Sequence, residues 1–325
     1  MLTYEEIKNH LEYHGKESEI YLPNDIFEEL KVIENVQHRA FAYSYIYLTT
    51  WIWRNGKYGE VKLSELSQSN IMNLLGKKGN TRLRYITAKG GLLEEIKYLE
   101  TSKDYPLHSS LTEEGLEFTY LSDYSHDSEI YEYLRPPSNF EAKLPIRGHH
   151  RNILDPEWKV EYEHGYEDGT FFEIENTFEV PFEVFMYCMS NKNVGEKGFY
   201  IYSFLKMKNQ MFNGYDVPMK GLAEQLKMPE KTAFTWLKTV RQYNMVQGIH
   251  NQDAFVVGLP KEQRKSNTYI TNDIEHFTNK PIEYAKMTVV KRSVYLEKVK
   301  KEQEKREQED IKKYGVTITL DQLPF

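Results

Sequence analysis

The stretch from Gly214 to Gly258 constrains the fold of this chain more than any other part of the sequence. A short amphipathic run over residues 219–226 is followed by a tight turn at 227–229, and a second periodic run extends from Glu230 to about Tyr243. In the second run one face carries residues at helical spacing, all of them apolar except the last: Ala233, Leu237, Val240 and Asn244. The pattern predicts two helices joined by a tight turn, and Pro229 suits the start of the second helix.

Two short apolar runs follow, over residues 245–249 and 254–258, with a polar loop between them. We expect them to form a hairpin of two strands. The order helix, tight turn, helix, hairpin resembles that of winged helix-turn-helix proteins. Proteins of that kind lay the helix after the turn in the major groove of DNA, and the hairpin contacts the backbone or the minor groove.

Part of this region has a counterpart earlier in the chain. Pairs of short matches recur 158 positions apart: Pro23–Phe27 with Pro181–Phe185, Asn35-Val36 with Asn193-Val194, Phe41–Ser44 with Phe199–Tyr202, and Asn55-Gly56 with Asn213-Gly214. With a shift of two residues, Val61–Leu66 parallels Val217–Leu222. Matches at one constant offset predict an internal duplication.

In the first copy we expect a long aromatic helix over residues 36–53 and a second helix over 67–75. A third helix should begin at Asn80, a good N-cap, and end at Lys89 before Gly90-Gly91. Residues 92–99 and 116–120 are candidate wing strands. In the C-terminal part, residues 282–314 read as one long charged helix, and residues 267–271 read as an exposed polar segment.

The predicted fold class is therefore mainly α with small β-wings, that is, α+β. It comprises two winged-helix domains arising from internal duplication and a long C-terminal helix. The predicted boundaries are a first winged-helix domain with an N-terminal helix at 1–122, a linker at 123–170, a second winged-helix domain at 171–275, and a charged helical tail at 276–325.

Composition excludes several classes of protein. The single cysteine, Cys188, cannot supply a disulfide framework or a cysteine-based zinc site. No apolar run reaches transmembrane length and the N-terminus lacks a signal-peptide core, so we expect a soluble, cytoplasmic protein with no membrane partner. Phosphate-binding loops and nucleophile elbows are missing from the sequence. We therefore expect no enzymatic activity, no cofactor and no metal.

A net charge of −7 argues against nucleic acid covering the whole protein, yet a local basic face can still bind DNA. Between residues 230 and 243 the only carboxylate is Glu230, and residues 77–89 contain none. Lys, Arg, Thr and Gln side chains contact phosphates and base edges. The predicted DNA-binding residues are Lys231, Thr235, Lys238, Thr239, Gln242 and Arg241 in the second copy, and Thr81, Arg82, Arg84, Tyr85 and Lys89 in the first.

Two winged helices joined by a linker resemble the replication initiators of theta-replicating plasmids and some phages. The proline-hydrophobic opening followed by a long helix is similar to the N-terminal domains of replisome-organiser proteins of plasmids and phages in low-GC Gram-positive bacteria. The resemblance covers residues 20–120 and 171–260, by pattern rather than by identity. It implies that Lys231, Thr235, Lys238 and Gln242 read the groove.

The function implied is sequence-specific binding of double-stranded DNA, as a plasmid or phage replication initiator or a transcriptional regulator. Expected partners are double-stranded DNA and either a second copy of the chain or the replication or transcription machinery. One alternative is a dedicated repressor or activator without a replication role. Another is a protein-interaction scaffold that uses its winged helices to dock other proteins.

Overall fold

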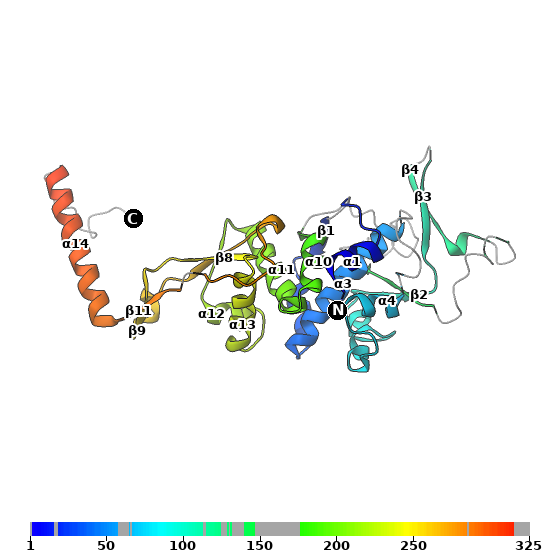
Figure 1. The fold of residues 1–325 in the computed structure, drawn as a ribbon, viewed down its shortest axis with the longest axis horizontal. Coiled ribbons are helices and arrows are strands. Elements are labelled where there is room, and N and C mark those ends of the chain that lie inside the picture. Colours follow the sequence, from blue (N-terminus) through cyan, green and yellow to red (C-terminus); the bar gives the residue numbers. More distant parts are fainter. Residues whose placement is uncertain are drawn as a thin grey trace, which may run out of the picture.

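The computed structural model describes residues 2–15, 19–57, 65, 67–112, 115–124, 129, 131, 140–146, 176–284 and 286–314 (Figure 1). We call residues 2–146 the first half and residues 176–284 the second half. The elements of the first half are α1 (Tyr4–His10), β1 (Glu19–Pro23), α2 (Ile26–Glu29), η1 (Leu30–Val32), α3 (Val36–Lys57), α4 (Gln68–Leu74), η3 (Thr81–Leu83), α5 (Arg84–Thr87), α6 (Leu92–Glu95), β2 (Glu100–Ser102), β3 (Pro106–Thr112), β4 (Gly115–Tyr120), η4 (Leu121–Asp123) and β5 (Ala142–Leu144).

The second half follows a similar order. Its elements are β6 (Thr177–Pro181), α10 (Phe182–Ser190), α11 (Gly195–Met211), β7 (Tyr215–Val217), α12 (Met219–Gln225), α13 (Glu230–Gln242), β8 (Val246–His250), β9 (Ala254–Val257), η5 (Lys261–Gln263), β10 (Asn267–Thr271) and η6 (Ile274–His276). Beyond it lie β11 (Thr288–Lys291) and the long helix α14 (Arg292–Tyr314). The fold is mixed α+β with small, mostly antiparallel sheets, and α14 is the long helix expected near the C-terminus.

One antiparallel strand pair joins the two halves. β1 pairs with β6 so that Glu19 lies opposite Pro181, Tyr21 opposite Glu179 and Pro23 opposite Thr177. Tyr21 and Glu179 occupy the same central position in their strands and are 158 positions apart, the offset of the sequence matches. A pair centred on matching residues has the geometry of a two-fold contact, in which each partner presents the same patch. The strand pair itself therefore has an approximate two-fold axis.

Aromatic side chains from both halves fill the space next to this pair. Phe27 lies in ring contact with Tyr43 of α3 and with Phe178, Tyr200 and Phe204 of the second half, at centroid distances of 5.2 to 5.6 Å. The Tyr47 hydroxyl donates to the backbone oxygen of Val180 at 2.6 Å. The buried apolar cluster runs without a break through both halves. Edge-to-face and offset ring pairs of this kind add stability beyond the area they bury.

The strands of the second half pair differently from the predicted hairpin. β8 pairs with β10, and β10 pairs with β7, which gives a three-stranded sheet in the order β7-β10-β8. The prediction that residues 245–249 and 254–258 pair with each other is wrong, because β9 pairs in parallel with β11. Residues 267–271 are not an exposed segment either: they form the central strand β10, and Tyr269 on it is buried.

The first half has a corresponding sheet. β2 pairs with β5, and an isolated bridge joins Ser67 to Ala142, so β5 lies between the segment before α4 and β2. β5 falls within residues 123–170, which the sequence assigned to a linker. Residues 92–99 do not form a wing strand: residues 92–95 are helix α6, and residues 116–120 belong to β4, which pairs with β3. The proposed counterpart Val61–Leu66 lies outside the described residues except for Glu65.

Four helix ends, two in each half, share one backbone hydrogen-bond pattern. α4 and α12 are followed by a residue with positive φ, Gly76 (66°) and Lys227 (45°) respectively, and α6 and α13 by Lys97 (60°) and Asn244 (53°). Each end has the same two backbone bonds, for example Lys227 N–H to Glu224 and Met228 N–H to Ala223, matched by Gly76 to Asn73 and Lys77 to Met72. This is the Schellman arrangement. The C-terminal ends of α6 and α13 thus share the same local geometry.

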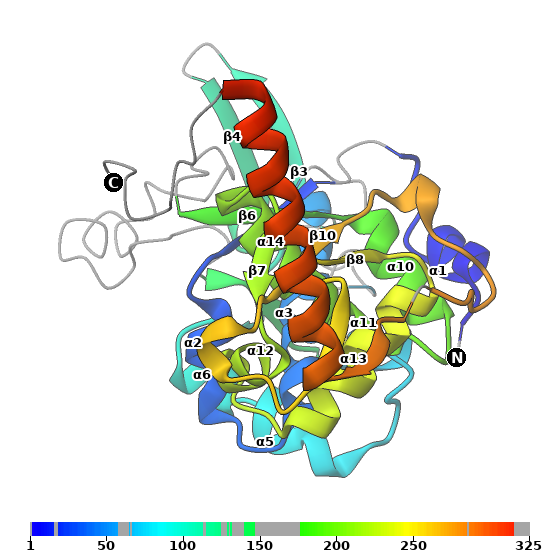
Figure 2. The ribbon, with the colours of Figure 1, turned by 90° about the vertical axis from the view of Figure 1, so that its left-hand side faces the viewer.

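The C-terminal arm projects from the second half. β9 and β11 form a parallel pair, and α14 extends beyond them, at the left of Figure 1 and towards the viewer in Figure 2. The prediction of one helix over 282–314 is wrong at its start, since the helix begins at Arg292. Pairs of Lys and Glu four residues apart, such as Lys298 with Glu302, line this exposed helix. Among the helices of the described residues, none is both long enough and apolar enough for a membrane crossing.

Replacing Phe27 by alanine should destabilise the whole protein by ~3–5 kcal/mol, the usual cost of removing a buried phenylalanine. Because Phe27 contacts rings of both halves, urea denaturation followed by tryptophan fluorescence and far-UV circular dichroism should give one shared, shifted transition. Phe27→Leu, which keeps most of the volume, should cost less than ~1.5 kcal/mol. Two separate transitions in the wild type would contradict a shared core.

Candidate nucleic-acid interface

The turn between α12 and α13 presents α13 on the surface. Ala233, Trp236, Leu237 and Val240 of α13 are buried, and the Trp236 ring meets Tyr200 of α11 edge-on. This buried stripe at helical spacing fixes which face of α13 points outward. The Trp236 side chain is only 5% exposed, so it packs into the core and does not face a ligand.

The outer face of α13 carries most of the residues predicted in this half. Lys231, Thr235 and Lys238 are exposed, and Thr239 and Gln242 are half-buried at its edge. The hydroxyls of Thr235 and Thr239 donate to backbone oxygens four residues earlier, at 2.8 and 3.1 Å, which leaves their methyl groups and oxygen lone pairs to face outward. The structure brings these five residues together on one helix.

One residue of this face is missing from the predicted set. The Phe234 side chain is 53% exposed, next to Thr235 and one turn from Lys231 and Lys238. An exposed phenylalanine among lysines can contact thymine methyl groups in a DNA groove. The sequence offered one signal that Phe234 is exposed. It directly follows Ala233 of the apolar stripe, and the next residue along a helix lies outside such a stripe.

Arg241 is placed differently from its neighbours. Its guanidinium lies over the Tyr284 ring, 4.0 Å from the centroid, and its Nη2 donates to the Gly248 backbone oxygen at 3.5 Å. The side chain therefore joins α13 to β8 and to the segment after β10. Reaching a DNA phosphate would require it to leave the tyrosine ring, a cation–π contact of about 0.5–2 kcal/mol.

The five predicted residues of the first half are also exposed, but on shorter elements. Thr81 and Arg82 lie on η3, Arg84 and Tyr85 on the single-turn helix α5, and Lys89 in the turn that follows. Asn80 caps η3 by accepting from the Arg82 N–H, as predicted, but the expected helix over residues 80–89 is wrong because α-helical geometry covers only Arg84–Thr87. The Tyr85 hydroxyl is 2.8 Å from Nδ1 of His38.

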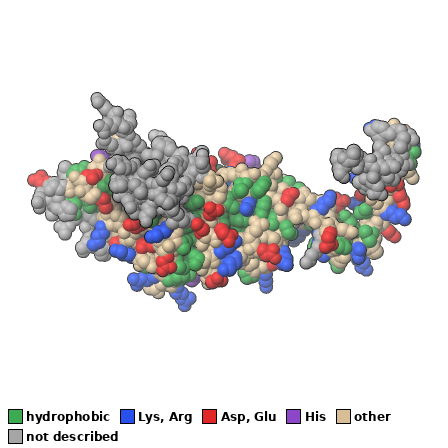
Figure 3. All heavy atoms as spheres, turned by 180° about the vertical axis from the view of Figure 1, so that it is seen from behind, with side chains coloured by type: hydrophobic (Ala, Val, Ile, Leu, Met, Phe, Trp, Pro, Cys, Tyr) green, Lys and Arg blue, Asp and Glu red, His purple; other side chains and the backbone are tan. Residues whose placement is uncertain are grey.

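Both sets lie on the same side of the molecule. α13 and the elements around α5 lie along the lower side in both Figure 1 and Figure 2. In the view from behind, Lys and Arg side chains are spread along this lower edge (Figure 3). Two lysines of the turns themselves are held by carboxylates, Lys77 by Glu196 and Lys227 by Glu34. Within the described part of the chain, no ion pair involves these cations of the lower side: Lys78, Arg82, Arg84, Lys89, Lys231 and Lys238.

A buried arginine of the first half holds the turn of the second half. Arg39 of α3 is fully buried and donates from Nε and Nη2 to the Ile33 backbone oxygen at 3.1 and 2.8 Å. Its Nη1 donates to the backbone oxygen of Leu226 at 2.5 Å and approaches that of Lys227 at 3.4 Å. Leu226 is the C-cap of α12, so the cation lies at the negative end of that helix.

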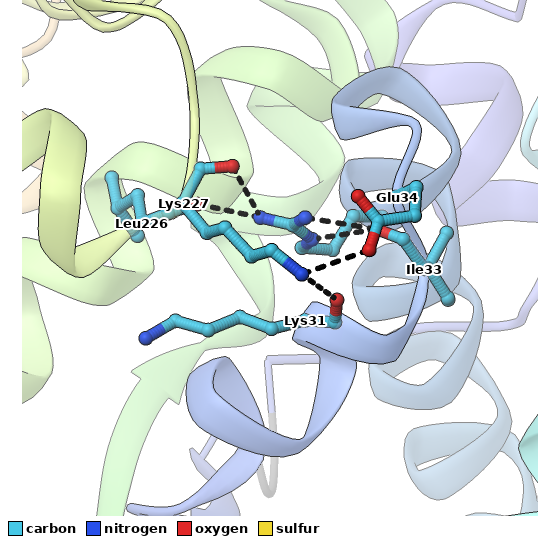
Figure 4. Close-up of polar contacts among 6 residues, drawn as sticks. Lys31, Ile33, Glu34, Leu226 and Lys227 are labelled. Carbon is cyan, nitrogen blue, oxygen red and sulfur yellow. Dashed lines mark hydrogen bonds and ion pairs between the residues drawn. The ribbon is translucent and has the colours of Figure 1, made fainter.

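The surface part of the same contact is shown in Figure 4. Lys227 Nζ donates to Glu34 Oε1 at 2.8 Å and lies 3.4 Å from the Lys31 backbone oxygen. The side-chain hydrogen bond from Lys227, followed by its charge, lowers the pKa of Glu34. Because both groups are exposed, this ion pair is worth little. The buried Arg39 is the stronger link between the two halves at this point.

The turn of the first half is held in return by the second half. Lys77 Nζ lies 3.1 Å from Oε2 of Glu196, in the first turn of α11. The other carboxylate oxygen of Glu196 is buried and has no hydrogen-bond partner among the described residues. Burial raises the pKa of Glu196, and the nearby Lys77 opposes that rise. The long helix of each half thus contacts the turn of the other half, which fixes the two turns relative to each other.

Comparisons with known proteins give no relative for this chain: no family model, curated protein or solved structure matches it. In the described residues, no group of three or more His, Cys, Asp or Glu side chains is placed to hold a metal ion.

Arg39→Met should lower the free energy of unfolding by ~2 kcal/mol or more, because it orphans buried backbone oxygens that cost ~1–3 kcal/mol each. Arg292→Met on exposed α14 is the matched control and should change stability by less than ~0.5 kcal/mol. Urea denaturation measures both. Equal, small effects in the two variants would show that Arg39 does not hold the turn.

Lys77→Met should make stability depend more steeply on pH. Glu196 already binds its proton more tightly in the folded protein than in the unfolded chain, because burial raises its pKa. Folding is therefore favoured at low pH, and stability is lost as pH rises through the unfolded and then the folded pKa of Glu196. Without Lys77 the folded pKa of Glu196 rises further, so the variant should lose more stability than the wild type as pH rises above 4.5, the ordinary pKa of a glutamate.

The measurement is thermal unfolding of both proteins across that pH range. In the double variant Lys77→Met/Glu196→Gln the additional pH dependence should disappear, because no ionisable group remains at the site. If the single variant shows the same pH profile as the wild type, Lys77 does not control Glu196.

Proposed function

We propose that this protein binds double-stranded DNA in a sequence-specific manner through two winged-helix domains, as a replication initiator or a transcriptional regulator. The observation that carries the proposal is the set of exposed cations on the lower side that no carboxylate of the described chain neutralises. In a protein of net charge −7, cations left unpaired on one face produce a local positive potential.

The topology of the second half supports the winged-helix assignment. Helix α11 is followed by strand β7, then by α12, the tight turn and α13, and then by β8 and β10. The segment between β8 and β10, residues 251–266, is the proposed wing. Central strand β10 lies between β7 and β8. This arrangement exposes α13 as the helix that enters a major groove, with the wing beside it.

The correspondence of the halves supports an origin by internal duplication. The central residues of the β1–β6 pair, Tyr21 and Glu179, are separated by the same 158 positions as the sequence matches. The equivalent turn residues Gly76 and Lys227 lie 151 positions apart, so length changes have accumulated after the long helices. One ancestral unit that duplicated and kept its strand contact would give this arrangement.

The approximate two-fold relation bears on the DNA site. Readers related by a two-fold axis meet half-sites of opposite orientation on one face of the duplex, about one helical turn or 10–10.5 base pairs apart. A single chain would then cover two adjacent groove segments without needing a second copy. Direct repeats of such a site beside the gene would favour a role in replication, and a single site at a promoter would favour transcriptional regulation.

A protein-interaction scaffold is the competing function, and salt separates the two. Binding to DNA releases counterions, so affinity should fall steeply between about 50 and 200 mM salt. An apolar docking surface has no such dependence. The described cations of the lower side favour DNA as the partner.

Lys238→Glu should weaken binding to the preferred DNA site by at least ~1–2 kcal/mol, or about 5–30-fold, because one contact is lost and a repulsion is added. The preferred site comes from selection out of a random duplex pool, and fluorescence anisotropy gives the affinities. Lys301→Glu on exposed α14, with the same change in charge, is the control and should leave the affinity within about twofold. Unchanged affinity in a folded Lys238→Glu protein would exclude α13 as the reader.

A further inference from the structure

The helical segment that follows the tight turn differs between the two halves, although the proposed duplication would make it alike in both. α13 is one continuous helix from Glu230 to Gln242. Its equivalent in the first half is interrupted, with α5 ending at Thr87 and α6 beginning at Leu92, although α6 ends in the same hydrogen-bond arrangement as α13. The first half therefore presents one helical turn outward where the second half presents three.

The interruption is built into the packing of this half. Gly90 has φ +72°, and a Cβ at Gly91 would lie 2.8 Å from the Ala88 backbone oxygen, so the bend requires glycine at both positions. The Gly90 N–H donates to Glu94 at 2.7 Å. Glu94 is in turn held by Lys143 of β5, which is 1% exposed, at 2.9 Å. A charge pair with one member this deeply buried holds the bend in place.

Beside the interrupted helix lies a hollow of about 280 Å³ between α4 and the turn that follows it. Its rim carries the exposed Lys78 and Arg84 and the hydroxyls of Ser69 and Thr81, with Gly79 between them. None of the described residues that line the hollow is acidic. Lys78 and Arg84 form no ion pair within the described chain.

The chemistry of this rim suits one ligand class. An ammonium, a guanidinium and two hydroxyls are the groups that proteins place on phosphate oxygens, and Arg adds a bidentate fork. A phosphate group carries no sequence information, so such a site positions a duplex without reading it. Helix α5, which contributes Arg84 and Thr87 to the lining, lies on the same lower side as α13 (Figure 2).

We infer that the hollow rimmed by Lys78 and Arg84 binds a backbone phosphodiester of DNA, and that the first half grips the backbone while only the second half reads bases. This inference rests on the proposed function, because it assigns the ligand of the first half within the same complex. The predicted contacts Thr81, Arg82, Arg84 and Lys89 thereby become phosphate contacts. The resulting DNA site has one specified groove segment and a neighbouring segment of free sequence.

The test compares two full-length variants with the wild type on the selected duplex and on a scrambled duplex. Lys78→Gln/Arg84→Gln removes both rim cations, and Lys238→Gln removes one cation from α13. Affinities are measured by anisotropy across a series of NaCl concentrations. Circular dichroism and thermal unfolding verify the fold, which the exposed positions of all three residues should preserve.

In the double variant the slope of log affinity against log salt should decrease in magnitude by about 0.9, because the contact with one phosphate is lost. Affinity should fall by the same factor on both duplexes, so that discrimination between them stays unchanged. Lys238→Gln should reduce that discrimination. Lys78→Arg/Arg84→Lys, which keeps both charges, should keep most of the slope.

The outcomes separate the two levels of the argument. A wild-type protein that binds neither duplex overturns the proposed function itself. A wild type that binds the selected duplex, together with a double variant of unchanged salt slope, overturns the phosphate site alone. A double variant that loses sequence discrimination would also overturn it, because the first half would then be reading bases.

Discussion

The antiparallel contact between β1 and β6 is the constraint on which the rest of the structure depends. It is centred on Tyr21 and Glu179, which are 158 positions apart in the chain, so the strand pair itself has the geometry of a two-fold contact. The long helices α3 and α11 follow these strands after short helices, and they pack against each other around shared aromatic rings such as Phe27 and Phe199.

The two turns are positioned by charges that cross between the halves. A buried guanidinium is costly unless its donors are matched, and Arg39 finds its acceptors at the backbone ends of η1 and α12. Glu196 of the second half makes the reciprocal contact with Lys77 of the first. Its hydrogen bonding is less complete than that of Arg39, since one of its carboxylate oxygens lacks a partner in the described chain. Such links resist hinge motion between the halves, so the spacing of the two exposed segments is a property of the fold rather than of a flexible linker.

An acidic protein with an unneutralised basic side can steer DNA to a defined face. In the proposed DNA complex, carboxylates elsewhere in the chain repel phosphate and the unpaired cations of the lower side attract it. The continuous α13 and the interrupted α5–α6 differ in shape, and we propose that they make different contacts with DNA. Under that proposal, duplication of a module followed by loss of base reading in one copy would leave the backbone contacts intact.

The sequence by itself determined the elements whose signals are local. Apolar spacing and Pro229 predicted α12, the turn and α13. The aromatic run predicted α3, the segment over residues 67–75 predicted α4, and the predicted N-cap Asn80 caps η3. The exposed residues of α13 followed from the same periodicity, apart from Phe234. These features depend on residues within one or two turns of each other, so a single sequence contains the information.

Only the tertiary structure decided the long-range partners. Alternation within a strand sets which face is buried but does not choose the neighbouring strand, so β8 pairs with β10 and not with the nearer β9. The short apolar run after Gly91 fits a strand or a helix, and packing made it α6. The sequence contains no signal for the role of Arg39 within its aromatic helix, because the Leu226 backbone oxygen that it binds lies 187 positions away in the chain.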